Sequence, residues 1–495
     1  MQPTTINLHT KFQIGPVDPR IFGGFLEHMG RAVYQGVFDP ESTLADENGF
    51  RTDVLKALQK LKMAVMRYPG GNFASGYHWT DGVGSIENRP TVKELAWNSI
   101  ESNRFGTDEY INLCREMDWI PMLCANLGTG TPEEARNWVE YCNCPEGTRY
   151  ADMRAANGNS ESFNVRLWCL GNEMDGSWQL GHVPAEQYAI RAQQAAKMMK
   201  AVDGTIELVV CGSSLPGLPT YMEWDRQVLE YVGDYADYIS LHNYVGNHSN
   251  DTADFLAVTN AIDRQIEEID SVCRFAQAKK GSPKRAWLCF DEWNVWYKNF
   301  EIDGEGKFAP HLIEEVYNLE DALVIAGFLH SFVRHADMVK IANLAQIVNV
   351  IAPILTRDDE MLIQSIFYPF EMFSSRRDGI SLGVDVEGSG YESPSNGYAR
   401  YIDASAILDE RKLHLFATNR SQIEDAEIRV KVADSVIAAF ESGELLTGSG
   451  PKVANSFDEP DLVDARPFKE VSLSDGQLTC KLPPLSLAAM TVDLE

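Results

Sequence analysis

Short apolar runs recur eight times between residues 18 and 370, with helical patterns between many of them, and this repetition limits the possible folds more than any other feature. Short apolar runs bounded by Gly, Asn or charged residues are typical of buried strands. The expected strands lie at residues 21–26, 63–66, 120–125, 165–173, 206–210, 238–241, 286–292 and 339–344. Amphipathic patterns between them predict helices at 54–61, 108–117, 132–142, 185–202, 256–278 and 319–335. Eight strands that alternate with helices predict an α/β fold, the (β/α)8 TIM barrel.

Polar residues follow each predicted strand. In a barrel of this kind, chemistry takes place at the carboxyl ends of the strands. The fourth run stops at Asn172 and Glu173, and the seventh ends on Glu292. A strand–helix unit takes about 30 residues, so three units fit between the two glutamates. We therefore expect Glu173 and Glu292 to lie on the same face of the barrel.

The pattern changes beyond residue 370. Alternating apolar and polar residues at 404–408, 412–418, 427–432 and 478–494 are typical of short strands, and no long amphipathic helix separates them. This region is predicted to form an all-β sandwich that resembles a jelly roll. The alternation T-I-N-L-H near the start could add one strand to it. The expected division is an N-terminal strand region at 1–17, the catalytic barrel at 18–370 and the sandwich at 371–495.

Charge and cysteine usage exclude several classes of function. A formal net charge of −29 argues against nucleic acid or an anionic membrane surface as a partner. No apolar run approaches the roughly 20 residues of a membrane span, and the first residues lack the apolar core of a signal peptide. Most of the nine cysteines fall within apolar patterns, which indicates buried free thiols in a reducing compartment. We expect a cytoplasmic protein without a metal or cofactor.

Two glutamates at strand ends suggest a reaction. A single glutamate there is more often a solvated or structural carboxylate, but Glu173 follows Asn172 and faces a second strand-end glutamate, Glu292. Glycoside hydrolysis needs two carboxyl groups on either side of one bond, the first to protonate the leaving oxygen and the second to attack or stabilise the sugar centre. Two nearby negative charges also raise the pKa of one of the pair.

Aromatic residues are frequent in the segments expected to follow the strands. Such residues either pack beneath a lid or stack on the faces of sugars. They are Trp79, Trp97, Trp178, Trp293, Trp296 and Tyr244. As a group they favour a carbohydrate ligand.

Five motifs in the chain resemble those of a known family, the intracellular α-L-arabinofuranosidases of glycoside hydrolase family 51. They are G-G-F-L-E-H-M-G-R, R-Y-P-G-G-N-F-A-S-G-Y, G-N-E-M-D-G, D-E-W-N-V-W and N-L-A-Q-I-V-N-V-I, in this order. The resemblance implies a retaining, exo-acting hydrolase that releases terminal α-L-arabinofuranosyl residues from arabinan, arabinoxylan or derived oligosaccharides by double displacement. It also implies a homo-oligomer, commonly a hexamer.

The resemblance also assigns roles to individual residues. Glu173 matches the acid/base of the family and Glu292 its nucleophile. Groups that hold the sugar would be Glu27, Asn72, Asn172 and Gln346, with Trp97 and Trp296 as further substrate-binding residues. Groups that orient the nucleophile and its neighbours would be Arg67, His242 and Tyr244.

Other functions fit parts of the same pattern. Within the glycosidases, a β-1,4-glucanase or β-xylosidase would use the same catalytic pair. A metal-dependent sugar isomerase could use Glu27, His28 and His242 as ligands, although no tight ligand cluster is evident from the sequence. A non-catalytic carbohydrate-binding protein would need only the sandwich and the aromatic residues.

Overall fold

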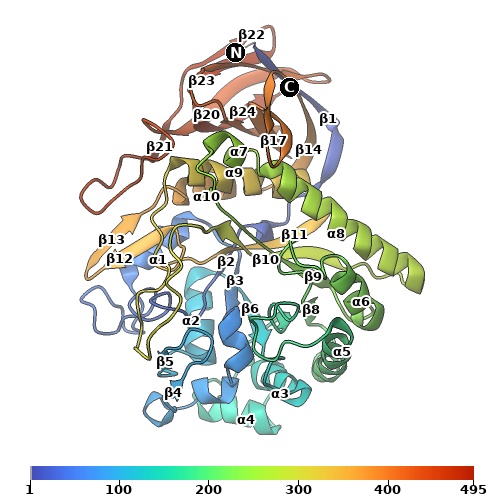
Figure 1. Cartoon of the computed structure of the whole chain (residues 1–495), viewed down its shortest axis with the longest axis vertical. Helices are drawn as coiled ribbons and strands as arrows, with labels where there is room; N and C mark the ends of the chain where they lie inside the picture. The colour runs from blue at the N-terminus through green and yellow to red at the C-terminus, as the bar shows by residue number, and fades with distance from the viewer. Residues whose placement is uncertain (1–2) are drawn as a thin grey trace.

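The computed structural model describes residues 3–495 and contains a closed barrel and a sheet-rich domain (Figure 1). Eight parallel strands form the barrel, which confirms the predicted architecture. In order around the barrel they are β2 (Gly23–Phe25), β3 (Val65–Tyr68), β6 (Ile120–Ala125), β7 (Leu167–Leu170), β8 (Glu207–Val210), β9 (Tyr238–Val245), β10 (Trp287–Val295) and β11 (Val339–Ala345).

Helices cover the outside of the barrel. They are α1 (Thr52–Lys60), α2 (Thr107–Met117), α3 (Pro132–Asn143), α4 (Arg149–Ala156), α5 (Ala185–Val202), α6 (Glu223–Val232), α7 (Thr252–Leu256), α8 (Thr259–Lys280), α9 (Leu319–Arg334) and α10 (Phe367–Ser374). The helix predicted at 256–278 was wrong in its start: Ala257 and Val258 donate hydrogen bonds to carbonyls three residues back, and this tight turn separates α7 from α8. Within residues 3–495, none of the helices has the length and apolar character needed to cross a membrane.

Mainly aliphatic and sulfur-containing side chains fill the inside of the barrel below the site. The interior cluster includes Met122, Cys124, Cys169, Val209 and Cys289. The nine cysteines are all unpaired, and all are buried except Cys144, which is partly exposed. The thiols are therefore packing groups of the core, as the apolar patterns around them indicated.

The second domain is a ten-stranded sheet that folds back on itself around its own apolar core. Its strands are, in order across the sheet, β21 (Asp464–Pro467), β20 (Ile437–Thr447), β24 (Ser486–Leu494), β18 (Lys412–Asn419), β17 (Ile402–Asp409), β14 (Ile380–Glu387), β1 (Thr4–Pro16), β19 (Ala426–Val432), β23 (Gln477–Leu482) and β22 (Val471–Ser474). Strand β1 pairs with β14 on one side and β19 on the other, so the N-terminal segment lies among C-terminal strands (Figure 1). The prediction of one strand at 478–494 was wrong: β23 and β24 are separated at Pro483 and Pro484, which cannot donate to a strand ladder.

Helices α9 and α10 lie between the barrel and the sheet domain (Figure 1). The His330 ring on α9 contacts the Ser405 hydroxyl through Nδ1 (2.8 Å) and the Thr418 hydroxyl through Nε2 (3.0 Å). Phe373 of α10 stacks on Phe416 of β18 with 3.9 Å between ring centroids. The two domains are thus joined by buried contacts away from the carboxyl ends of the barrel strands.

Candidate active site

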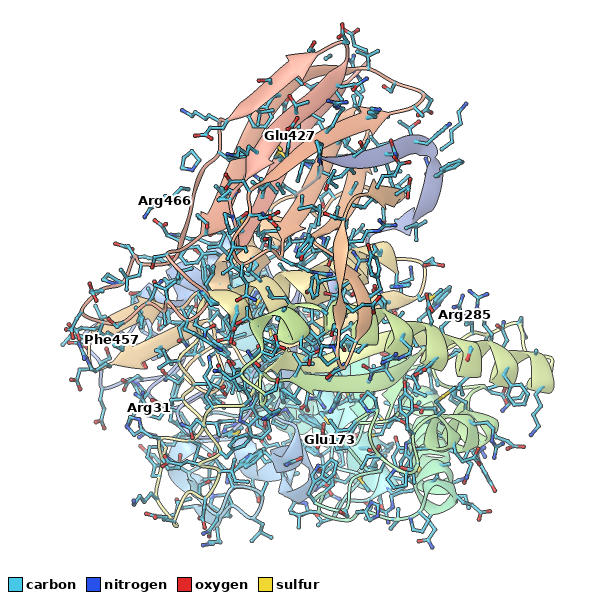
Figure 2. All side chains as sticks on the ribbon, turned by 45° about the horizontal axis from the view of Figure 1, so that its top comes forward. Arg31, Glu173, Arg285, Glu427, Phe457 and Arg466 are labelled. Atoms are coloured by element: carbon cyan, nitrogen blue, oxygen red, sulfur yellow. The ribbon has the colours of Figure 1, made fainter. Side chains whose placement is uncertain are left out.

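A cavity of about 310 Å³ lies at the carboxyl ends of the barrel strands, on the face that the sequence indicated. Figure 2 shows Glu173 in the barrel portion of the molecule, well separated from Glu427 and Arg466 on the sheet domain. The lining combines three carboxyl groups with apolar and aromatic side chains. It consists of Glu27, Met29, Asn72, Trp97, Glu173, Trp178, Leu215, Tyr244, Glu292, Trp296, Ile302, Ile313, Gln346 and Ile351.

A tight turn after β7 carries Glu173 into the cavity. Gly171 has φ +89° and Glu173 itself has φ +43°, so the backbone enters the left-handed region twice. This conformation is uncommon for a residue with a side chain and is found at functional sites. The Glu173 carboxylate accepts from Trp178 Nε1 at Oε2 (2.5 Å) and contacts His242 Nδ1 at Oε1 (2.8 Å). Both of its oxygens are therefore held by side chains.

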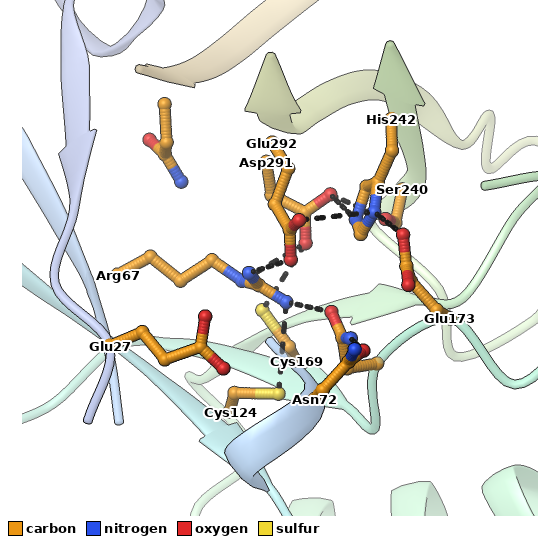
Figure 3. Close-up of polar contacts among 12 residues, drawn as sticks. Glu27, Arg67, Asn72, Cys124, Cys169, Glu173, Ser240, His242, Asp291 and Glu292 are labelled. Carbon is orange, nitrogen blue, oxygen red and sulfur yellow. Dashed lines mark hydrogen bonds and ion pairs between the residues drawn. The ribbon is translucent and has the colours of Figure 1, made fainter. Parts of the chain in front are cut away.

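Glu292 lies opposite, on β10. Its Oε1 accepts from Arg67 Nη1 and its Oε2 accepts from the Tyr244 hydroxyl, each at 2.8 Å. A carboxylate oxygen of Glu292 and one of Glu173 lie within 4.8 Å of each other. The structure thus places the two glutamates as a close pair on one face of the barrel, with Arg67 and His242 beside them (Figure 3).

Asp291 also faces this site, and sequence reasoning missed it. Successive residues of a strand normally point to opposite faces, so a residue next to Glu292 is expected to face outwards. The register of β10 is shifted against β9 between Cys289 and Glu292, and against β11 between Phe290 and Trp293. This bulge turns Asp291 inwards together with Glu292, because one extra residue is inserted on one side of the ladder. The acidic dipeptide D-E in an otherwise apolar strand was the available signal.

Arg67, on β3, is fully buried and links two acids of β10 to Asn172, which follows β7. Its guanidinium contacts Asp291 (Nε to Oδ2, 3.2 Å), Glu292 and the Asn172 side-chain oxygen (Nη2 to Oδ1, 2.7 Å). Although burial disfavours the charged form, Asp291 and other nearby groups raise the pKa of Arg67. The guanidinium therefore stays charged and fixes the orientation of both Glu292 and Asn172.

His242 bridges the acids on the other side. Besides Glu173, its Nδ1 lies 3.5 Å from Glu292 Oε2, and its Nε2 lies 3.3 Å from Asp291 Oδ1. Burial lowers the pKa of His242, but Glu292, Asp291 and Glu173 outweigh it and raise the pKa well above the usual value. Asp291 keeps a lowered pKa in spite of burial, because Arg67 and His242 stabilise its charge. The ring is thus an imidazolium that faces carboxylates from both nitrogens.

Glu27 is the third carboxyl group in the cavity and lies just beyond β2. Its Oε1 accepts from the Phe73 amide (3.0 Å) and from Trp97 Nε1 (3.3 Å), and its Oε2 accepts from Gln346 Nε2 (3.0 Å). Burial and the nearby Glu292 raise the pKa of Glu27 to about 8. The backbone of Gly71 passes between these acids, where an added Cβ would lie 3.0 Å from Glu292 Oε1. The Gly-Gly pair of the second motif is therefore needed for close approach.

The predicted amide and aromatic residues separate into two groups. Asn72, Gln346, Trp97, Trp178, Trp296 and Tyr244 line the cavity, and Asn172 lies against it through Asn72 and Arg67. Trp79 and Trp293 do not, so their prediction as rim residues was wrong. Trp79 is buried against Trp138 of α3, and Trp293 lies within β10, where strand alternation turns its ring outwards onto Phe328 and Phe332 of α9.

The geometry does not suit the set of metal ligands that a sugar isomerase would need. His28 points away from the cavity and pairs with Glu101 (Nδ1 to Oε2, 2.9 Å). Glu173, His242 and Glu292 approach within 4.8 Å of one another, as metal ligands do. However, a metal requires a neutral imidazole, whereas His242 is held as an imidazolium, and the Arg67 guanidinium lies 2.8 Å from Glu292.

Known proteins resemble this chain over its full length. Residues 57–264 match the alpha-L-arabinofuranosidase 1 domain, and residues 291–486 match the alpha-L-arabinofuranosidase C-terminal domain. An intracellular exo-alpha-(1->5)-L-arabinofuranosidase of Acetivibrio thermocellus is 41% identical, with 97% of this chain and 98% of the relative covered. An exo-alpha-(1->6)-L-arabinofuranosidase of Bifidobacterium longum is 35% identical, with 99% of this chain and 98% of the relative covered.

Solved structures give the same result. A family 51 alpha-L-arabinofuranosidase from Bifidobacterium longum superposes with a TM-score of 0.94 at 33% identity, covering 99% of this chain and 100% of the other. The arabinose complex of the Thermotoga maritima alpha-L-arabinofuranosidase has a TM-score of 0.89 at 32% identity, with 99% and 100% covered. The likeness therefore extends over both the barrel and the sheet domain.

Proposed function

Since the chain belongs to the α-L-arabinofuranosidases of glycoside hydrolase family 51, we propose that it removes terminal non-reducing α-L-arabinofuranosyl residues with retention of anomeric configuration. One observation carries the retaining mechanism: carboxylate oxygens of Glu173 and Glu292 lie within 4.8 Å of each other. Retaining glycosidases hold the two carboxyl groups about 5–5.5 Å apart, whereas inverting ones leave about 6.5–9.5 Å for a water.

In the first half of the reaction, a Glu292 oxygen attacks the anomeric carbon while the bond to the leaving oxygen breaks. Glu173 gives its proton to that oxygen, which leaves a carboxylate beside the His242 imidazolium (2.8 Å). Arg67 and Tyr244 hold the Glu292 carboxylate towards the cavity before the attack.

In the second half, Glu173 takes a proton from a water that attacks the same carbon. The bond between the sugar and Glu292 then breaks, so two successive inversions give net retention.

The cavity explains exo action on a small sugar. Its volume, about 310 Å³, is at the lower end of the range for ligand sites, which suits one sugar residue with the aglycone outside. Polar groups on its wall suit the furanose hydroxyls. They are Glu27, Asn72, Gln346 and, behind Asn72, Asn172. Trp97 closes the wall beside Glu27, and Trp296 packs edge-on against Tyr244 at 5.7 Å between ring centroids.

Product stereochemistry tests this proposal directly. Proton NMR of an early reaction mixture should show the α-anomer of arabinofuranose before mutarotation. Release of the β-anomer would overturn the retaining assignment.

The substrates we propose are arabinan, arabinoxylan and oligosaccharides derived from them. The two curated relatives described above are named for (1->5) and (1->6) linkages, respectively. A panel of 4-nitrophenyl glycosides should show turnover of the α-L-arabinofuranoside and little or none of the β-D-xyloside and β-D-glucoside. A preference for either of the latter would instead favour a xylosidase or glucanase.

We also propose that the protein works as a cytoplasmic homo-oligomer, a hexamer by family resemblance. Relatives named intracellular support the compartment. Two adjoining loops expose apolar side chains, among them Leu95 (62% exposed) and Phe300 (60% exposed), which is consistent with a covered face in an assembly. Light scattering coupled to size-exclusion chromatography would measure the mass; a monomer would contradict the proposal.

A further inference from the structure

Trp178 binds the carboxyl group of Glu173, the residue proposed as the acid/base. The roles assigned above give this contact no function. The indole nitrogen of Trp178 donates to Glu173 Oε2 at 2.5 Å. Because an indole N–H can only donate, Glu173 Oε2 is the acceptor in this contact. The other oxygen, Oε1, contacts His242. Trp178 and His242 together therefore set the plane of the Glu173 carboxyl group.

The position of the indole is built into the loop that follows Glu173. Gly176 lies beneath the ring: a Cβ added there would be 2.4 Å from indole atoms Cε2 and Cζ2. Gln179, the residue after Trp178, anchors the loop. Its side chain donates to Ser75 Oγ (2.5 Å) and accepts from Asn172 Nδ2 (3.4 Å). The ring can thus lie back towards Glu173 only because residue 176 has no side chain.

Trp178 also lies at the mouth of the cavity. It lines the cavity, yet its side chain is 45% exposed, unlike Trp97 at 9%. A residue at the mouth that binds the acid oxygen is well placed to keep the proton directed at the departing oxygen. A hydrogen bond of this kind to an ionisable group acts on the chemical step when the step needs that proton.

We propose that Trp178 is a positioning residue for Glu173, which aligns the acid for protonation of the leaving oxygen and matters most for aglycones that are poor leaving groups. The proposal rests on the role of Glu173 proposed above. It predicts a leaving-group signature that a general loss of structure or of sugar binding would not give.

The test compares Trp178→Phe with wild type on two substrates, an arabinobiose and 4-nitrophenyl α-L-arabinofuranoside. We expect kcat/KM for the disaccharide to fall by roughly 10-fold to 100-fold, as for loss of one hydrogen bond to a charged group. The aryl substrate, whose leaving group needs little protonation, should change by no more than about 3-fold in its glycosylation rate. Gly176→Ala should give the same pattern, because its Cβ displaces the ring.

Trp296→Phe is the matched control. It makes the same substitution on the same cavity wall, but its indole donates to the backbone carbonyl of Asn299 (2.7 Å) and not to Glu173. Any loss of activity in Trp296→Phe should be equal on the disaccharide and on the aryl substrate.

Equal losses for Trp178→Phe and Gly176→Ala would overturn the inference, provided that Glu173→Ala still shows the leaving-group dependence of a missing acid. If Glu173→Ala itself shows none, the proposed function fails instead. Circular dichroism and melting temperature identify any variant that fails to fold. If Trp178→Phe does not fold, Gly176→Ala tests the inference by itself, because it displaces the indole without replacing it.

Discussion

Two ionic clusters in this protein, one buried and one partly buried, differ in their balance of charge. At the barrel mouth, four carboxyl groups surround one guanidinium and one imidazole. They are Glu27, Glu173, Asp291 and Glu292, with Arg67 and His242. At the domain interface, two aspartates face two arginines, with contacts between Arg334 and both Asp263 and Asp403, and between Arg420 and Asp403.

One acid from each cluster illustrates the difference, because the pKa values of Glu27 and Asp403 move in opposite directions. Burial and the neighbouring Glu292 raise the pKa of Glu27 to about 8. Burial acts on Asp403 as well, but Arg334 and Arg420 lower its pKa. The balanced cluster therefore stabilises the fold in its ionised form, whereas the excess of acid at the barrel mouth opposes folding and is retained for chemistry. This comparison can be tested by removing one acid at a time.

The largest effect is expected at Glu292. Glu292→Ala should lower kcat on every arabinoside by on the order of 10⁵-fold or more, since no nucleophile remains. Azide added to this variant should yield a glycosyl azide of inverted configuration, because only one displacement then occurs. The fold should persist, because the variant removes one charge from a cluster with excess acid; a melting temperature well below that of wild type would contradict that interpretation.

Glu173→Ala should have a smaller and selective effect. Turnover of natural arabinosides should fall about 10²- to 10⁴-fold, as for loss of general acid catalysis, while formation of the intermediate from an aryl arabinoside is largely spared. Azide should then release the sugar faster and give a glycosyl azide of retained configuration. Recovery of an inverted azide from this variant, with a retained one from Glu292→Ala, would exchange the two roles.

Removal of Asp403 should affect stability instead of chemistry. Asp403→Ala leaves the buried Arg420 without a carboxylate partner and Arg334 with only one, which costs about 3–5 kcal/mol of unfolding free energy. Urea denaturation would measure the loss, and kcat below the transition should stay near that of wild type. The exposed pair of Asp464 with Arg466 serves as control, since Asp464→Ala should hardly shift the midpoint. If Asp403→Ala and Asp464→Ala destabilised the protein equally, burial would not distinguish the interface ion pairs from the exposed pair.

Glu27→Gln should reveal the repulsion at the barrel mouth as a pH effect. The pKa of Glu27 is higher in the folded state, about 8, than the ordinary 4.5, so wild type loses stability from this group as pH rises between these values. The free energy of unfolding of the variant relative to wild type should therefore increase between pH 5 and 9, by about 1.4 kcal/mol per unit of pKa difference at most. If the difference in unfolding free energy between variant and wild type did not change with pH, the pKa of Glu27 would not be raised in the folded state.

The sequence alone could predict the ring of strands and the residues at its mouth. Helix α5 and strand β6 have the predicted bounds, because their apolar spacing and end residues are local signals. Glu173 and Glu292 could be predicted for a similar reason: Glu173 follows β7 and Glu292 lies near the carboxyl end of β10, and parallel strands of one barrel expose their carboxyl ends on one face.

Tertiary structure decided the features that depend on two or more segments at once. Asp291 faces the site only because β10 bulges against both of its neighbours, which reverses the alternation that the sequence implies. Trp293, the residue after Glu292 on β10, packs on α9 and not in the cavity, and Trp178 reaches Glu173 only because Gly176 leaves room for its ring. Local patterns therefore determined which strand ends carry acids. Strand register and close packing between distant segments determined which side chains meet there, since neither is encoded within a single window of sequence.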